Sequence, residues 1–438
     1  MSSAAPTTKE SQIVALAKRI LQNVETFSDH LDSNNVPQPT FDADGPDDLA
    51  TNNETIDKAR FSTIEDVIEL QDLLLGPKIL LRPQWNAVSL QAIYRYDLAQ
   101  LVPLDGDISF SELSKLSGLY EPDLRRILRF AMIYHRTFKE PRKGFVAHTG
   151  ASRAIATDEN VKNALGLMFD ESYQSYAKAS TVDAMQKFED RSVTHTGFSL
   201  AHGTDLPYFQ YLQANPEKYK RFAGAMAAFG QSEDVSPAFL ATAYSWDKLG
   251  EQATLVDVGG ATGAVDLVIA EKHTNLSFII QDKEAVILDA EKQDFSEDLR
   301  KRFTFQSHDF FTPQTVAAEA YLFRYVLHNW PDQYAIDILR QTIPVLKEGS
   351  RIVIHDSLLP EPCTASATTE REVRSMDMLM LTLSNARERE LDDWRKLLQD
   401  ADARFHLLAH VVPEGSSLAI MEVVWTTDAA SHKSFLNV

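Results

Sequence analysis

The chain has 438 residues, of which 44% are hydrophobic, and a formal net charge of -20 at pH 7. This length predicts a globular protein of two or three domains, and the negative charge disfavours nucleic acid or an anionic membrane as a partner, because phosphate binding relies on a basic surface. The single cysteine, Cys363, excludes a disulfide framework within the chain, and no apolar run approaches the roughly 18 residues of a membrane-spanning helix.

Residues 1–55 are expected to form an N-terminal helix and an arm. Met1–Glu10 lacks the apolar core of a signal peptide, so we expect a cytoplasmic protein. Apolar side chains recur at helical spacing from Ser11 to about Leu31, which predicts an amphipathic helix. The stretch from Asn34 to Asn53 is rich in Pro, Asp and Asn, which is typical of a linker or of an arm draped over a neighbouring surface.

Residues 56–215 are predicted to form a helical domain. Helices are expected from about Ile64 to Leu75 and from Pro83 to Gln100. Ser109–Gly118 and Glu121–Phe130 predict a helix-turn-helix, since a glycine ends the first segment and a proline stands near the start of the second. Phe138–Val146, centred on a glycine, would be the wing of that module.

A winged helix-turn-helix raises the hypothesis of a DNA-binding regulator. The predicted second helix and wing carry a locally basic set of side chains, namely Arg125, Arg126, Arg129, Arg136, Arg142 and Lys143. Acidic residues at Glu121, Asp123 and Glu140 interrupt the set, and the rest of the chain is acidic. A solvated protein surface is therefore favoured over a nucleic-acid contact.

Residues 216–438 are predicted to begin with a long helical stretch, Pro216–Thr242, and to continue as alternating strands and helices. The most informative part is Thr254–Gly263, where an apolar run breaks into a glycine-rich turn and then a helical pattern. The glycines are Gly259, Gly260 and Gly263. They let the backbone approach a ligand where a Cβ would collide. A dinucleotide fold expects a further glycine where Val258 stands, which weakens that alternative.

Acidic residues stand at three consecutive predicted strands. Asp257 precedes the glycine turn, Asp282 closes the run Ser277–Asp282, and Asp309 closes Phe303–Asp309. An acid at the end of the second strand of a βαβ unit can accept hydrogen bonds from both ribose hydroxyls of a nucleoside. The third acid would lie toward the adenine. Each acid taken alone could equally be a solvated helix cap.

The next predicted strand carries the chemistry. The run Ala320–Asp332 leaves His328 at the carboxyl end of its strand, where open α/β sheets place their ligands. A further strand, Ser350–Asp356, ends in another acid, and Glu388 supplies one more. A lone histidine at a strand end is more often structural than catalytic, but the accompanying acids favour catalysis here.

Together these motifs resemble the S-adenosylmethionine-dependent O-methyltransferases of the caffeate type, small-molecule enzymes of fungi and plants. The resemblance covers nearly the whole chain and includes Arg324–Asp332, Leu358–Pro360 and Arg387–Arg389. It implies an α/β fold in which a C-terminal Rossmann-like methyltransferase sheet, with helices on both faces, follows an α-rich winged-helix dimerisation domain. It also implies a homodimer that uses S-adenosyl-L-methionine and leaves S-adenosyl-L-homocysteine.

The resemblance assigns roles to single residues. His328 matches the general base, and Asp356 and Glu388 match two acids that orient it. Plant members usually have glutamate at the first of these acids, so Asp356 is one methylene shorter, and Ala261 replaces a frequent third glycine. The expected cofactor-binding residues are Asp257, Gly259, Gly260, Gly263, Asp282, Asp309, Phe310 and Arg324.

The mechanism that this implies has a simple physical basis. A phenol has a pKa of about 10 and a neutral imidazole about 6.5, so the hydroxyl is a poor nucleophile until a base takes its proton. Carboxylates at Asp356 and Glu388 would hold the ring of His328 in one tautomer and stabilise the imidazolium. This chemistry needs no metal, and the histidines are not set at metal-ligand spacing.

The acceptor is expected to be a small phenol, a fused or decorated aromatic of polyketide type, because no basic cluster indicates a charged substrate. Candidate pocket residues are Phe169, Tyr173, Met226, Phe229 and Met380. Each could equally belong to the plain core. Two alternatives stay open: a methyltransferase-like pericyclase or dehydratase that binds the cofactor without transferring methyl, and a non-catalytic binding protein.

Overall fold

The computed structural model describes residues 11–46, 49–76, 88–177, 180–230, 232–292, 295–361, 365 and 367–427. The chain divides into two compact units. The first comprises residues 1–169 with the short segments 221–225 and 366–368, and the second comprises the remainder. Met1–Glu10, Cys363 and the first five residues of the helix expected over Pro83–Gln100 lie outside the described residues. The domain boundaries expected near residues 55 and 215 stay a prediction.

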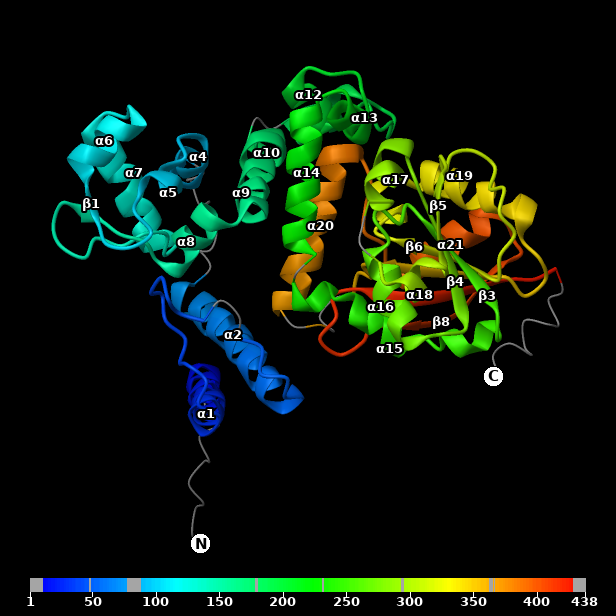
Figure 1. Ribbon diagram of the computed structural model, residues 1–438, viewed down its shortest axis with the longest axis horizontal. Helices are drawn as coiled ribbons and strands as arrows, with labels where there is room; N and C mark the ends of the chain where they lie inside the picture. Colours follow the sequence, from blue (N-terminus) through cyan, green and yellow to red (C-terminus); the bar gives the residue numbers. More distant parts are fainter. Residues whose placement is uncertain are drawn as a thin grey trace, which may run out of the picture. The chain divides into compact units, whose positions relative to one another are not determined.

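The first unit is built mainly of helices (Figure 1). Helices α1 and α2 pack against each other, and Arg19 of α1 donates two hydrogen bonds to the Asp66 carboxylate of α2. The elements of this unit are α1 (Gln12–Ser33), α2 (Glu54–Leu75), α4 (Val88–Arg95), α5 (Leu98–Leu101), β1 (Ile108–Ser109), α6 (Phe110–Ser117), α7 (Glu121–Tyr134), β2 (Phe145–Val146), α8 (Gly150–Thr157) and α9 (Glu159–Gly166).

The predicted helix-turn-helix is confirmed as α6 and α7, and its residues explain its ends. The Ser109 hydroxyl accepts from the Glu112 N–H while the Glu112 carboxylate accepts from the Ser109 N–H, a capping box that starts α6. Gly118 ends α6 in the left-handed conformation, with φ 71°. Beyond α7, β2 pairs antiparallel with β1, and a bridge between Lys139 and Ala147 closes the turn expected over Phe138–Val146.

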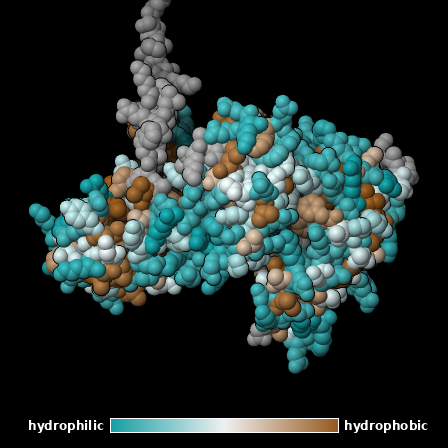
Figure 2. Space-filling view, turned by 90° about the horizontal axis from the view of Figure 1, so that it is seen from above, coloured by the Kyte–Doolittle hydropathy of each residue, from teal (hydrophilic) through white to brown (hydrophobic). Residues whose placement is uncertain are grey.

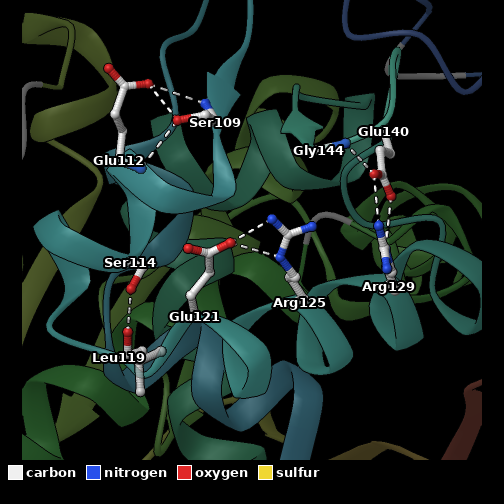
Figure 3. A network of polar contacts seen from close by, with 9 residues as sticks. All are labelled: Ser109, Glu112, Ser114, Leu119, Glu121, Arg125, Arg129, Glu140 and Gly144. Carbon is white, nitrogen blue, oxygen red and sulfur yellow. Dashed lines mark hydrogen bonds and ion pairs between the residues drawn. The ribbon is translucent and has the colours of Figure 1, made fainter.

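Four of the six basic side chains of this module have acidic partners. Arg125 pairs with Glu121, and Arg129 donates two hydrogen bonds to Glu140, whose carboxylate also accepts from the Gly144 N–H (Figure 3). These bonds hold the pKa of Glu140 down to about 2. The remaining pairs are Arg126 with Asp123 and Arg142 with Asp107. Pairing neutralises much of the locally basic charge on which the DNA-binding hypothesis depends.

Two helix predictions need correction. The helix expected over Pro83–Gln100 is two helices where it is described, because Asp97 adopts the left-handed φ of 52° between α4 and α5. The long helix expected over Pro216–Thr242 is broken after α14 (Pro216–Phe229). A 3-10 turn, η2 (Glu233–Val235), follows, and Ser236 and Pro237 then start α15 (Pro237–Ala243) as N-cap and first residue.

The second unit contains the sheet (Figure 1). A short π-helix, η1 (Leu167–Ser172), spans the boundary between the units. The helices before the sheet are α10 (Tyr173–Ala177), α11 (Ser180–Lys187), α12 (Gly197–His202), α13 (Tyr208–Gln213), most of α14, α15 and the 3-10 turn η3 (Trp246–Leu249). The strands and later helices are β3 (Ala253–Val258), α16 (Ala264–Lys272), β4 (Leu276–Asp282), α17 (Glu284–Ala290), α18 (Glu297–Arg300), β5 (Phe303–Ser307), β6 (Ala320–Arg324), η4 (Leu327–Asn329), α19 (Asp332–Thr342), η5 (Ile343–Val345), β7 (Arg351–Asp356), α20 (Ala367–Ser384), α21 (Leu391–Ala401), β8 (Phe405–Val411) and β9 (Ala419–Trp425).

The sheet has the order β5-β4-β3-β6-β7-β9-β8, in which the first five strands are parallel and β9 and β8 are antiparallel to their neighbours. The chain adds β4 and β5 on one side of β3 and then crosses over to add β6 and β7 on the other. The turns that follow β3 and β6 therefore meet where the strand order reverses, which is where open α/β sheets bind their ligands.

Alternate strand residues pack on opposite faces of the sheet, as its pleat requires. Val256, Phe323 and Ile354 join α19 and α21 in one buried cluster. Leu255, Leu322 and Val353 join α15 and α16 in the other. The expected α/β sheet with helices on both faces is thus confirmed. In the part of the chain that the structure describes, no helix is long and apolar enough to cross a membrane.

Candidate active site

The glycine turn follows β3 at the switch point of the sheet. Gly259 has a φ of 78°, and a Cβ added there would lie 3.0 Å from the Val326 side chain. A Cβ on Gly260 would lie 2.5 Å from Oδ2 of Asp257. The turn is thus a tight backbone cradle that side chains would fill. Ala261 adopts the left-handed φ of 49°, a conformation that costs a non-glycine residue about 1 kcal/mol.

Asp282 lies at the end of β4, directly beside this turn. Its Oδ2 accepts from the Ala261 N–H at 3.0 Å and its Oδ1 from the Lys283 N–H at 2.7 Å. Burial raises the pKa of this carboxyl, while both backbone bonds oppose the shift. A carboxylate has about four acceptor positions, so Asp282 can still accept from a diol.

Asp309 and Phe310 follow β5. The Asp309 carboxylate accepts from the Phe311 N–H at 3.0 Å, and the residue is exposed. These contacts match the alternative given for each acid, a solvated cap of the local turn. The half-buried Phe310 ring lies beside the glycine turn, 3.9 Å from a Cβ built on Gly259. It also meets the Trp330 ring edge to face, with the ring centroids 6.0 Å apart. An aromatic wall therefore flanks the cradle.

Arg324 ends β6 and points to the face that α15 and α16 cover. One guanidinium nitrogen contacts His355 Nδ1 at 2.6 Å, and the other donates to the Val235 carbonyl at 2.6 Å. Burial and then Arg324 lower the pKa of His355 to about 3, so this imidazole is neutral and accepts at Nδ1. Arg324 also acts electrostatically on Asp257, which is buried next to the turn.

His328 lies in η4, immediately after β6, and is 5% exposed. Tyr325 turns the chain out of the strand with a left-handed φ of 53°, and its ring centroid lies 5.1 Å from that of His328. Nδ1 of His328 is 2.8 Å from Oε1 of the fully buried Glu388 side chain. Burial alone would lower the pKa of this imidazole, but Glu388 and, more weakly, Asp356 raise it overall.

Asp356 ends β7 but does not hydrogen-bond to His328. The residue is fully buried, and among the described residues neither carboxylate oxygen has a hydrogen-bond partner. Burial raises the pKa of Asp356 to about 6, and the Glu388 carboxylate adds to the shift. Of the two acids expected to orient the ring, Glu388 contacts it and the shorter Asp356 does not, so Asp356 acts on His328 through its charge. Their roles stay a prediction.

Arg389 and Asp377 hold this histidine–glutamate pair in place. The Arg389 guanidinium is fully buried and donates to the carbonyls of Leu327 and Trp330 at 3.1 and 2.9 Å and to Asp332 at 2.9 Å. Asp377 of α20 accepts from the Glu388 N–H at 2.9 Å. Arg389, the neighbour of Glu388 in the chain, thereby attaches the Glu388 segment to the backbone on both sides of His328.

The five acceptor candidates differ in exposure. Phe169 belongs to the first unit and is buried, and Met380 of α20 is 6% exposed. Tyr173, Met226 and Phe229 are 38%, 40% and 45% exposed, which leaves their surfaces available to a ligand. Their assignment to the acceptor pocket stays a prediction.

Sequence reasoning missed four polar residues that surround the site: Asp266, His355, Asp377 and Arg389. Asp266 interrupts the apolar pattern of Ala264–Ala270, and His355 interrupts the apolar run of β7, so both carried a signal in the form of a polar residue at an inward position. Arg389 stood in the motif Arg387–Arg389 but was given no role, and Asp377 accepts from a backbone N–H, which no sequence pattern announces. Within the described residues, no three His, Cys, Asp or Glu side chains come together as metal ligands.

A family model described as an O-methyltransferase domain matches residues 182–404 of the chain. The chain is 46% identical to the grayanic acid biosynthesis cluster O-methyltransferase of Cladonia grayi, over 95% of this chain and 88% of that protein. It is 34% identical to the chlorophenol O-methyltransferase of Trichoderma longibrachiatum, over 95% of this chain and 91% of that protein.

Solved structures share the fold at lower identity. The crystal structure of OxaC aligns with a TM-score of 0.71 at 23% identity, over 95% of this chain and 100% of that one. A structure described as a pericyclic reaction enzyme aligns with a TM-score of 0.70 at 20% identity, over 94% of this chain and 100% of that one. Likeness at this level concerns the fold, which therefore does not separate the two kinds of chemistry.

Proposed function

The chain belongs to the O-methyltransferase family, and we propose that it transfers the methyl group of S-adenosylmethionine to a phenolic oxygen of a small aromatic metabolite, with His328 as the general base. The observation that carries the proposal is the 2.8 Å contact between Nδ1 of His328 and the buried Glu388 carboxylate. This contact sits beside the glycine turn, at the point where the strand order reverses.

The tautomer of His328 follows from its partner. An ionised carboxylate can only accept, so Nδ1 carries the proton that it donates to Glu388, and the lone pair lies on Nε2. Among the described residues, Nε2 of His328 has no hydrogen-bond partner that would occupy this lone pair. Nε2 is thus the atom that can take a proton from an acceptor hydroxyl.

Glu388 also compensates the charge that forms. When His328 takes the proton, a buried imidazolium arises, and burial alone would make it costly. The negative Glu388 side chain offsets this cost, and the Asp356 carboxyl contributes when it is ionised. The acceptor oxygen then attacks in line, so the remaining tasks of the protein are alignment and exclusion of water.

The proposed cofactor residues fit a nucleoside carrying an amino acid. Gly259, Gly260 and Gly263 keep side chains out of the cradle, and Asp282 has acceptor positions left for a ribose diol. Asp257 and Arg324 bring charge to the amino-acid end. Bound S-adenosylmethionine supplies the electrophilic methyl group. Asp309 and Phe310 complete the expected set, with the Phe310 ring suited to cover an adenine.

A phenolic acceptor is supported by chemistry and by relatives. The raised pKa of His328 brings it closer to that of a phenol, which eases the proton transfer. One relative is named a chlorophenol O-methyltransferase and another belongs to a biosynthetic gene cluster, which supports an aromatic secondary metabolite as substrate. The exposed aromatic and methionine side chains among the candidates, Tyr173, Met226 and Phe229, suit a flat ring.

The alternative is a pericyclase or dehydratase that binds the same cofactor without using its methyl group. Such a reaction does not require a base held by a buried carboxylate, whereas His328 and Glu388 are paired here. The test incubates the protein with methyl-labelled S-adenosylmethionine and a panel of phenols. Labelled methyl ethers together with S-adenosylhomocysteine are expected. Conversion of an aromatic substrate without any consumption of the cofactor would favour the alternative.

A further inference from the structure

Two buried carboxyl groups face each other beneath the glycine turn. Asp257 is the last residue but one of β3 and Asp266 lies in the first turn of α16, and they are 3% and 0% exposed. Asp257 points to the sheet face that α16 covers, because it alternates with Leu255 along the strand. Asp266 stands in the first turn of that helix, directly after the glycine turn, and each carboxyl affects the protonation of the other.

The hydrogen bonds of this pair are incomplete. Among the described residues, neither carboxylate oxygen of Asp266 has a hydrogen-bond partner. Two ionised carboxylates offer only acceptors to each other, and an unpartnered buried polar atom is costly. A single proton held between Asp257 and Asp266 supplies a donor to the Asp266 carboxylate, which has none among the described residues. The pair would then carry one negative charge instead of two.

The charges around the pair do not replace that proton. Arg324 attracts Asp257, but its guanidinium bonds to His355 and to the Val235 carbonyl instead of forming an ion pair with it. Asp282 on β4 adds negative charge. Helix α15, which packs on α16, has no charged side chain.

The far end of α16 is also uninvolved. There Arg302 donates to the backbone carbonyls of Ala270 and His273, and His273 contacts the Ala241 carbonyl. The balance of charges near the pair is consistent with retained protons. Burial raises the pKa of Asp257 to about 6, and burial followed by repulsion from Asp257 raises that of Asp266 well above its usual range.

The pair lies against the proposed cofactor site. Oδ2 of Asp257 is so near Gly260 that a Cβ there would approach it to 2.5 Å, so this carboxyl supports the cradle directly. The amino-acid part of the cofactor carries an ammonium group. A positive charge at this end of the site favours the fully ionised form of the pair.

We propose that Asp257 and Asp266 share one proton while the cofactor site is empty, and that cofactor binding releases this proton to solvent. The pair then passes from one negative charge to two, and the ammonium group of the cofactor compensates the added charge. Asp266 is thereby a positioning residue that acts through Asp257. The inference rests on the proposed function, because it requires the cofactor to bind at this turn.

The proposal has a defined pH dependence. Where the pair holds its proton, binding must remove it, so affinity for the cofactor rises with pH by up to about tenfold per pH unit. Above the range in which the empty pair loses the proton, affinity is constant. A site whose carboxyls were already ionised would show no such rise.

The experiment is calorimetric titration with S-adenosylhomocysteine, which carries the same ammonium group, in two buffers of different ionisation enthalpy near pH 6. The wild-type protein is expected to release about one proton per ligand bound. Asp266→Asn keeps the size of the side chain and carries a permanent donor, so it should release none and bind with little pH dependence. The matched control, Asp289→Asn, removes an acid that is 74% exposed on α17 and should retain the release.

The outcomes separate this inference from the proposed function. Binding without proton release in the wild-type protein, or release that persists in Asp266→Asn, overturns the inference and leaves the methyltransferase proposal intact. Failure of the wild-type protein to bind S-adenosylhomocysteine contradicts the proposed function itself. If Asp266→Asn does not fold, the affinity of the wild-type protein for S-adenosylhomocysteine is measured across a pH series. An affinity that does not change with pH overturns the proposal of a shared proton.

Discussion

At the scale of single residues, the two acids near His328 differ in what they can do. Glu388 contacts the ring at 2.8 Å, while the carboxyl of Asp356 has no hydrogen bond to it. The Glu388 side chain can therefore hold the orientation of the ring as well as its charge. Asp356 can influence only the charge.

Replacing Glu388 should change the pH dependence of catalysis in a predictable direction. Glu388 raises the pKa of His328, and a general base must be unprotonated, so turnover rises as pH increases through that pKa. Glu388→Gln lowers the pKa of His328, which moves the acidic limb of the rate profile to lower pH. The plateau should fall by about tenfold or more, because a neutral amide does not stabilise the imidazolium and can present its NH2 group to Nδ1, which selects the wrong tautomer. The profile of kcat/KM against pH measures both effects.

Asp356→Asn is the matched comparison for that variant. It should shift the acidic limb in the same direction but by less, and should leave the plateau within about threefold of wild type, since the Glu388 contact remains. Equal losses of plateau rate in the two variants would mean that Asp356 also orients the ring.

Residues of the site were predictable where their type and position carried the signal. His328 was singled out because it follows a predicted strand and is accompanied by acids at strand ends, whereas the role of Glu388 was assigned from the resemblance to the O-methyltransferases. Asp266 was not, since an acid in the first turn of a helix is ordinarily a solvated residue that favours the helix dipole. Only its burial beside Asp257 distinguishes it.

At the scale of elements, the glycine turn is tested by two substitutions, one that adds a methyl group and one that removes a methyl group. Gly260→Ala would bring a Cβ within 2.5 Å of Oδ2 of Asp257 and should displace that carboxyl, so S-adenosylhomocysteine binding is expected to weaken by about tenfold or more. Ala261→Gly relieves the left-handed φ of 49° and should bind within about twofold of wild type. Calorimetry gives both values. Unchanged S-adenosylhomocysteine binding in Gly260→Ala would contradict the assignment of Asp257 to the cofactor site.

The segment around Glu388 should depend on Arg389 for its attachment to the loop that carries His328. Arg389→Met leaves the Leu327 and Trp330 carbonyls and the Asp332 carboxylate without this donor, and should lower the free energy of unfolding by about 3 kcal/mol. The control Arg395→Met breaks an ion pair with Asp392 in which the arginine is 56% exposed, and should cost less than about 1 kcal/mol. Denaturant titration measures the free energy of unfolding of both variants. Equal losses would contradict the proposed role of Arg389 in attaching the Glu388 segment.

The strands of the sheet were predictable because each is an apolar run of the expected length, and β3, β4, β5 and β7 lie within a few residues of their expected positions. The break between α14 and α15 was less visible. It is marked by residues 230–234, which are all non-apolar or glycine, and by Ser236 and Pro237, which are start signals for the second helix. Periodicity therefore located the elements, while local stop and start signals decided their ends.

At the scale of the whole molecule, the first unit exposes apolar side chains that a monomer would leave in water. Figure 2 shows such patches among hydrophilic side chains, including those at the left of the view, where the cyan helices of Figure 1 lie. The most exposed of these residues in the described part of the first unit are Phe41, Leu74, Val88, Tyr120, Ile133 and Tyr134. Exposed patches of this kind commonly mark protein interfaces.

We therefore expect a homodimer in solution. Sedimentation equilibrium should give twice the chain mass of 49.2 kDa at micromolar concentrations. Leu74→Glu and Ile133→Glu, which introduce charge at two exposed apolar positions, should report which surface is used by shifting the protein to monomer. A monomeric wild-type protein would contradict the expectation.

The central claim is that Nε2 of His328 removes the proton of an acceptor hydroxyl. The most direct measurement compares acceptor phenols of different pKa, because a phenol that is already ionised needs no base. With a phenol of ordinary pKa, about 10, His328→Ala should lower turnover by about a hundredfold or more at neutral pH, with S-adenosylhomocysteine affinity nearly unchanged. With an electron-poor phenol that is already ionised at the same pH, the variant should approach the wild-type rate. An equal loss with both acceptors would contradict a role for His328 as the base.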